Sequence, residues 1–220
     1  MDEENGTKHW EDFYTSNNGE NKPSPFAVFV EGKIRSSSLV IDVGCGNGRD
    51  SNFFLNKGHS VIALDGSEAA VNRLSELFRG RQNFMVGKHV FGEDLHTLVG
   101  RVNDFVRSFA LSSPPNVVIY NRFFIHAINE VAESAFLDWI SSKPSGFVLE
   151  NVYFEYRTLA DADTPKKFGN HYRRYVNPSE FESKLVERKF TVEHLGEGQG
   201  FAMMGDEDPF VCRQSSRLAI

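Results

Sequence analysis

This 220-residue sequence has only two cysteines, and none of its apolar runs approaches the length that a membrane-spanning helix needs. Cys45 and Cys212 lie far apart, and neither belongs to a CxxC or Cys/His ligand spacing, so we expect no metal site. The N-terminal residues are acidic and polar, without the basic and apolar regions of a secretory signal. We therefore expect a cytoplasmic protein.

The sequence also has no block of lysine and arginine that could follow a phosphate backbone, and its net charge is −6. Tight nucleic-acid binding is not expected from such a chain. Its hydrophobic share of 40% and charged share of 25% are those of a soluble globular protein. We expect residues 1–25 to form an N-terminal arm and residues 26–220 to form a single domain, which is long enough to bury a core.

Short apolar runs alternate with helical patterns along most of the chain. Strands are expected at residues 39–43, 61–64, 84–86, 117–121 and 146–154, with two more near the C-terminus. Helices are expected at residues 25–34, 50–57, 67–78, 101–111, 130–141 and 178–189, with Asn129 and Asn177 as N-caps of the last two. This alternation predicts a Rossmann-like α/β fold, with a doubly wound, mostly parallel sheet that binds its ligand beyond the carboxyl ends of the strands.

A glycine-rich turn, VIDVGCGNGRDS (Val40 to Ser51), joins the first of these strands to a helix. Gly44, Gly46 and Gly48 stand at alternate positions, where they let the backbone approach a ligand and leave N–H groups at the start of the helix. Asp65 ends the next strand and is placed to accept hydrogen bonds from a ribose. Together these residues predict a pocket for an adenosine-bearing cofactor.

Three details distinguish this stretch from the nicotinamide fingerprint. Asp42 precedes the first glycine by two positions, the spacing is GxGxG rather than GxGxxG, and the run continues as GNGRDS…KGHSVIALDGSEAAV. The stretch resembles the class I S-adenosylmethionine (SAM)-dependent methyltransferases and is similar to their thiopurine and tellurite-resistance branch. The resemblance implies SAM as the cofactor and a seven-stranded sheet whose last strand is antiparallel.

The same resemblance assigns roles in cofactor binding. Asp42 and the loop from Gly44 to Gly46 would flank the methionine moiety, and Asp65 would hold the ribose. Gly66 would lie beside the adenine, and Asp94 would lie near the adenine amino group.

Further residues are candidates for contacts at the methionine end. By the resemblance, Asn121, at the end of the fourth strand, would approach the sulfonium. Arg49 is a candidate for binding the cofactor carboxylate, and Asp50 is either a helix N-cap or a ligand contact. Tyr14 and Trp10 either close over the cofactor, with Tyr14 donating to its carboxylate, or simply pin the arm to the sheet.

Side chains for the methyl acceptor cluster after the fourth strand and in the HYRRY run: Arg122, His126, His171, Tyr172, Arg173 and Arg174. A neutral His126 can serve as a general base or can pack against its neighbours. Arg173 and Arg174 can bind an anionic acceptor through charge-assisted hydrogen bonds or can form surface ion pairs. An acceptor that is already an oxyanion needs no base.

The segments YNRFFIHAI, LENVYFEYR, HYRRYV and GFAMMGDEDPFVCR are similar to a bacterial subgroup found with capsule and O-antigen synthesis. That resemblance implies an O-methyltransferase acting on a small or glycan-linked anionic acceptor, of the phosphoryl or phosphoramidate type. Two other functions stay open: a nicotinamide-dependent oxidoreductase on the same fold, and a non-catalytic protein that binds SAM.

Overall fold

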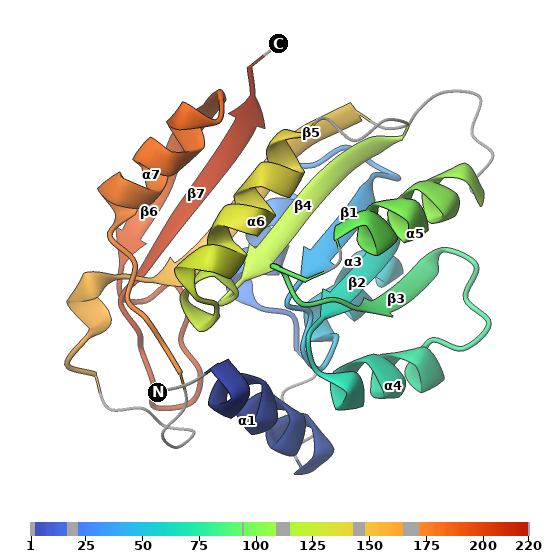
Figure 1. Ribbon diagram of the computed structural model, residues 1–220, viewed down its shortest axis with the longest axis horizontal. Coiled ribbons are helices and arrows are strands. Elements are labelled where there is room, and N and C mark those ends of the chain that lie inside the picture. The colour runs from blue at the N-terminus through green and yellow to red at the C-terminus, as the bar shows by residue number, and fades with distance from the viewer. Residues whose placement is uncertain are drawn as a thin grey trace.

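The computed structural model describes residues 3–16, 22–93, 95–108, 115–142, 148–164 and 172–219. One seven-stranded sheet of order β3-β2-β1-β4-β5-β7-β6 forms the centre (Figure 1). Its strands are β1 (Leu39–Val43), β2 (Ser60–Asp65), β3 (Phe84–Lys88), β4 (Asn116–Arg122), β5 (Val148–Arg157), β6 (Phe190–Gly198) and β7 (Val211–Leu218). Strands β1 to β5 pair in parallel, whereas β7 runs antiparallel to both β5 and β6. The predicted doubly wound sheet with an antiparallel last strand is confirmed.

Helices cover both faces of this sheet (Figure 1). They are α1 (Glu3–Ser16), α2 (Pro25–Glu31), α3 (Arg49–Asn56), α4 (Glu68–Leu77), α5 (Leu95–Ser108), α6 (Glu130–Ser141) and α7 (Pro178–Glu187), with short 3-10 turns η1 (Ile125–Ala127) and η2 (Leu159–Asp161). Helices α5, α6 and α7 bury their apolar residues in one core and helices α2, α3 and α4 in the other. Within the described ranges no helix combines the length and the apolar character needed to cross a membrane.

Local sequence signals explain most helix starts. Asn129 accepts a hydrogen bond from Ala132 N, and Asn177 accepts one from Ser179 N. Asn177 directly precedes Pro178, the first residue of α7. Both predicted N-caps are therefore confirmed. The helix predicted at residues 101–111 begins earlier, at Leu95, and residues 109–111 lie outside the described part of the chain.

The N-terminal arm contains a helix that its polar composition did not predict. Helix α1 lies beside α4 (Figure 1), and Glu11 joins the two. One oxygen of Glu11 accepts from Ser67 Oγ at 2.7 Å, and the other accepts from Ala69 N at 3.0 Å. A carboxylate is favourable at a helix N-terminus, so Glu11 holds α1 against the first turn of α4.

The chain order of the strands reverses between β1 and β4, which are neighbours in the sheet. At such a switch point the connections leave toward opposite faces and open a crevice beyond the carboxyl ends of the strands. The glycine-rich turn follows β1 and the segment 123–126 follows β4, so both meet at this crevice.

Candidate functional site

A cavity of about 1300 Å³ occupies the crevice, and residues that follow β1, β2 and β4 line it together with residues of α1. Pockets for small molecules commonly measure about 300–1000 Å³. The cavity therefore has room for a cofactor and a second small molecule or part of a larger one.

The glycine loop after β1 forms one wall of this cavity. Gly44, Gly46 and Gly48 have φ values of 74°, 53° and 75°, a region that other residues rarely adopt. A Cβ on Gly46 would meet Tyr14 Oη, and a Cβ on Gly44 would lie 3.0 Å from Phe124 Cδ2. The positive φ values favour glycine at both positions, and the packing of the loop leaves little room for a side chain.

Asp65 is fixed at the end of β2 by backbone donors. Its Oδ2 accepts from Gly46 N at 2.8 Å, and its Oδ1 accepts from Ser67 N at 2.9 Å. Burial raises the pKa of Asp65, and these two hydrogen bonds partly offset that effect. Each carboxylate oxygen keeps a second lone pair, so the fixed carboxylate can also accept from a pair of ribose hydroxyls.

Asp42 brings a second buried carboxylate to the same loop. Its side chain is 2% exposed, and Oδ2 accepts from Ser51 Oγ at 2.5 Å. Burial raises its pKa, as do the neighbouring charges of Asp50 and Asp65, and the resulting pKa is about 7. Three acids around one loop give a negative potential, which suits a cationic ligand group such as an ammonium or a sulfonium.

Asp50 belongs to a buried hydrogen-bond network rather than to the helix cap. The N-cap of α3 is Gly48, whereas Asp50 accepts from Ser24 N at 2.7 Å, from Ser24 Oγ at 2.8 Å and from Tyr120 Oη at 2.7 Å. Tyr120 also lines the cavity. The network ties α2, α3 and β4 together behind the cofactor end of the cavity.

The structure places the remaining predicted cofactor residues as follows. Tyr14, Arg49 and Gly66 line the cavity with the residues described above. Asn121 does not: it is fully buried, and its Nδ2 donates to Tyr153 O at 3.0 Å. Because successive strand residues point to opposite faces, its neighbour Tyr120 lines the cavity instead. Asp94 lies outside the described residues.

Phe123 lines the cavity in the segment where the acceptor was expected, and two arginines lie near its ring. The guanidinium carbon of Arg122 lies 4.1 Å from the centre of the Phe123 ring, and that of Arg157 lies 5.3 Å from it. Phe123 has a φ of 59°, which is strained for a bulky side chain and is often found at functional sites. The ring therefore holds two arginines at one end of the cavity.

Arg122 is fixed in this part of the cavity wall through a fully buried carboxylate. Glu155 accepts from Arg122 Nε at 2.7 Å and from Arg213 Nε at 2.7 Å. One carboxylate shared by two guanidinium groups leaves a net positive charge. Sequence reasoning missed Glu155 and Arg213, because only the register of β5 and β7 brings them together.

Arg173 adds a further positive charge to the wall. It lines the cavity with Tyr172, and its pKa is lowered by burial and by the nearby charge of Arg157. Arg157 itself donates to Asp161 at 2.7 Å and pairs with Glu207 from the β6–β7 loop. Arg122 and Arg173 are thus the predicted arginines that the fold brings to the cavity.

His126 lines the cavity, but its hydrogen bonding contradicts the general-base hypothesis. Its Nδ1 accepts from the backbone N of Arg157 at 3.0 Å, so the proton of the neutral ring is on Nε2. A nitrogen that already carries a proton cannot remove another from an acceptor. His126 can therefore donate a hydrogen bond from Nε2, but it cannot act as the base.

Arg174 has a structural position and is not among the described residues that line the cavity. Its Nε donates to Ile128 O at 2.9 Å and its guanidinium pairs with the buried Glu133. The prediction that Arg174 binds the acceptor is therefore wrong, since its donors hold the η1 segment in place. His171 lies outside the described residues.

Trp10 lines the cavity from α1, as does Tyr14, which agrees with the expectation that the arm closes over the cofactor. Other lining residues were not expected: Glu11 from α1, Val131 from the start of α6, and Met204 from the β6–β7 loop. The spacing of Trp10 and Tyr14, four residues apart, places both on one face of a helix and could have indicated α1.

Comparison with known proteins supports this architecture. Residues 8–109 match the family model described as tellurite resistance protein TehB. A TehB-like SAM-dependent methyltransferase from Corynebacterium glutamicum is similar in structure, with a TM-score of 0.57 and 12% identity over 96% of each chain. A SAM-dependent methyltransferase from Anabaena variabilis has a TM-score of 0.62 and 17% identity, over 97% of this chain and 95% of that one.

The glycopeptide N-methyltransferase MtfA, in complex with SAM, has a TM-score of 0.58 and 14% identity, over 95% of this chain and 97% of that one. A comparison with the curated proteins gave no significant match. At these identities the structural likenesses establish the fold, and the nature of the methyl acceptor depends on the residues of the cavity.

Proposed function

We propose that this chain, a class I SAM-dependent methyltransferase of the TehB-like branch, methylates an oxygen of a small or glycan-linked anionic acceptor. The observation that carries the proposal is the composition of the acceptor wall. Arg122 and Arg173 line it, and its histidine is placed to donate a hydrogen bond rather than to remove a proton. An acceptor bound here must arrive with its nucleophilic atom already deprotonated.

The cofactor end of the cavity fits SAM. Asp65 is fixed to accept from the ribose, the glycine loop brings the backbone close to the ligand, and Asp42 offers a carboxylate to the methionine ammonium. When bound, SAM supplies an electrophilic methyl group on its sulfonium. The match to a methyltransferase family and the GxGxG spacing both argue against a nicotinamide-dependent oxidoreductase.

The protein's own part in the reaction is to bind and align the acceptor. Charge-assisted hydrogen bonds from Arg122 and Arg173 would hold a phosphoryl or phosphoramidate-type anion, and His126 Nε2 would donate to it. Methyl transfer is an in-line displacement, so this alignment and the exclusion of water provide the rate enhancement. An ammonium acceptor, in contrast, would be repelled by the arginines.

Two broader features of the proposal follow from the fold and the resemblance. The similarity to the capsule and O-antigen subgroup supports a role in polysaccharide synthesis, with the acceptor carried on a glycan or its precursor. Cys45 and Cys212 are both free thiols, which supports the cytoplasm as the compartment because thiols stay reduced there.

A screen of acceptors with product detection by mass spectrometry tests the proposal. Phosphorylated sugars would be compared with the same sugars without phosphate and with amino sugars, each in the presence of SAM. We expect methylation of the phosphorylated members only.

In the Arg173→Ala variant turnover should fall by at least about tenfold while SAM affinity is unchanged, whereas the exposed Arg217→Ala should match the wild type. Methylation of neutral sugars or amines, undiminished in Arg173→Ala, would show that the anionic acceptor is wrong.

A further inference from the structure

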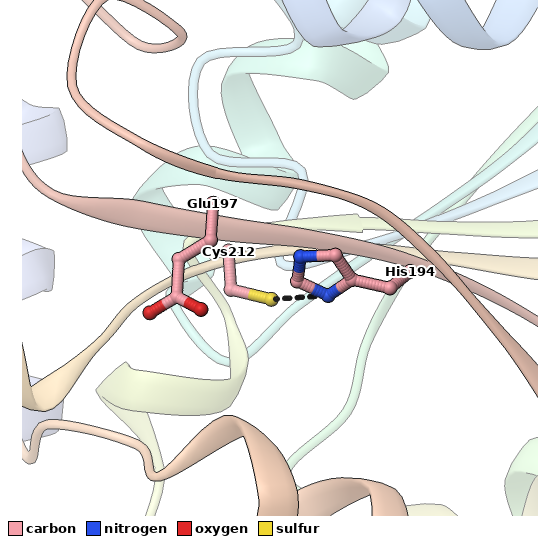
Figure 2. A group of neighbouring side chains, drawn as sticks. All are labelled: His194, Glu197 and Cys212. Carbon is pink, nitrogen blue, oxygen red and sulfur yellow. Dashed lines mark hydrogen bonds between the residues drawn. The ribbon is translucent and has the colours of Figure 1, made fainter.

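Three side chains with metal-binding chemistry converge on one face of the β6–β7 pair: His194, Glu197 and Cys212 (Figure 2). One ligand atom from each lies within 4.8 Å of the other two. Figure 2 shows the imidazole and the carboxylate on either side of the thiol. Among the described residues that line the catalytic cavity none of these three occurs, so the cluster is separate from that site.

A β-bulge explains how the cluster forms. Residues three apart in a regular strand point to opposite faces of the sheet, so His194 and Glu197 could not normally act together. The register of β6 against β7 shifts between His194 and Gly196, whereas Glu197 is directly opposite Cys212. The extra residue brings His194 to the same face as the other two side chains.

The distances are close to those of a tetrahedral zinc site. Cys212 Sγ lies 3.8 Å from His194 Nδ1. Zn–N bonds of about 2.0–2.1 Å and Zn–S bonds of about 2.3 Å place two ligands of one tetrahedral ion roughly 3.5 Å apart. Cys212 is fully buried and held by the sheet, while His194 and Glu197 are exposed and can adjust.

The surrounding charge also favours a cation. Burial raises the pKa of the Cys212 thiol, and so do the negative charges of Glu197 and of Glu182, on α7. A bound cation would offset these two charges. The donors are one imidazole nitrogen, one carboxylate oxygen and one sulfur, a borderline-soft set that suits zinc better than calcium or magnesium.

We propose that His194, Glu197 and Cys212 bind one divalent transition-metal ion, with Zn²⁺ as the best fit and water as the fourth ligand. On binding, the Cys212 thiol releases its proton to solvent and the sulfur ligates as thiolate. The ion would link β6 to β7 at the base of the loop that supplies Met204 to the cavity and Glu207 to Arg157. Metal binding would therefore stabilise the hairpin that carries part of the acceptor wall.

Titration of the untagged full-length protein with Co²⁺ tests this site, because sulfur ligation produces an intense near-ultraviolet charge-transfer band. We expect one equivalent of Co²⁺ to give that band, Zn²⁺ to displace it, and Cys212→Ser to abolish it. His194→Gln and Glu197→Gln should each weaken Zn²⁺ binding by at least roughly tenfold. Glu193→Gln, an exposed neighbour on β6, is the matched control and should bind as the wild type does.

The exposed ligands keep the test decisive if Cys212→Ser does not fold. The proposal is wrong if the wild type gives no charge-transfer band, or if His194→Gln binds Zn²⁺ as tightly as Glu193→Gln does. Neither result depends on methyl transfer, so failure of this site and failure of the proposed function can be distinguished.

Discussion

Asp42 is a buried acid whose effect on stability should depend on pH. Its pKa is about 7 in the folded protein, above the usual 3.8, so between these values the folded state holds a proton that the unfolded state has lost. The free energy of unfolding should therefore fall as the pH rises through this window. Asp42→Asn removes the buried charge and should be more stable than the wild type near pH ~8, by on the order of 1–3 kcal/mol.

Urea unfolding of both proteins over a pH series measures this difference. The gap between Asp42→Asn and the wild type should narrow as the pH falls from about 7 and should close below 3.8, where both states of the wild type bind the proton. A gap that does not change with pH would contradict the raised pKa. The same variant should bind SAM less tightly, since it lacks the carboxylate offered to the ammonium.

Arg173 and Arg174 are adjacent but should behave differently when substituted. Arg174→Ala removes donors to Ile128 O and leaves Glu133, 2% exposed, with fewer partners. We expect a loss of about 2–4 kcal/mol in the free energy of unfolding. Arg173→Ala should cost less than about 1 kcal/mol, because Arg173 lines the cavity and its charge is opposed by that of Arg157. Equal losses in urea unfolding would show that the two positions are not distinguished in this way.

Individual site residues were predictable where a local motif fixes their position. Asp42 and Asp65 lie at the carboxyl ends of β1 and β2, and the glycines follow β1, so the sequence alone places them at the crevice. For His126 and Arg174 the sequence left two roles open, because the choice depends on hydrogen bonds with distant segments, to Arg157 and Glu133. No spacing in the sequence reports such contacts.

Helix α1 is the element whose position has the clearest functional consequence. Trp10 and Tyr14 line the cavity from it, and Glu11 fastens it to the start of α4. We expect Glu11→Ala to loosen α1 and to speed SAM dissociation by about 5- to 30-fold, as the loss of about 1–2 kcal/mol in hydrogen bonds implies. Stopped-flow dissociation of SAM measures this rate.

Thr15→Ala is the matched control, because Thr15 is exposed on α1 and is not among the described residues that line the cavity. It should leave the dissociation rate at the wild-type value. If Glu11→Ala and Thr15→Ala release SAM at the same rate, α1 does not cover the cofactor.

Most elements were predictable because their apolar periodicity and caps are local. β1 and α6 match the predicted bounds, and Asn177 marks the start of α7. α1 was missed because its helix is polar and gains its partner from α4. The bulge in β6 could not be predicted from the sequence, since it exists only as a register shift against β7. The His194–Glu197–Cys212 cluster depends on that bulge and was therefore missed as well.

The molecule as a whole lines one cavity with acidic and basic side chains from distant segments. Asp42 and Asp65 lie at the carboxyl ends of β1 and β2, and Arg122 and Arg173 line the same cavity. The set offers partners both to a cationic donor and to an anionic acceptor. It was only partly predictable, because the motif fixes the two acids whereas the packing of β5, β7 and their loops fixes Arg122.

Isothermal titration of SAM into the wild type and into Asp65→Asn measures whether this cavity binds SAM through Asp65. NAD serves as the comparison ligand, and the unfolding midpoint of the variant checks that it is folded. We expect SAM to bind the wild type, NAD not to bind, and Asp65→Asn to weaken SAM binding by about 1–3 kcal/mol, or roughly 5- to 150-fold. If SAM does not bind, or binds a folded Asp65→Asn with equal affinity, the cavity is not a SAM site held by Asp65.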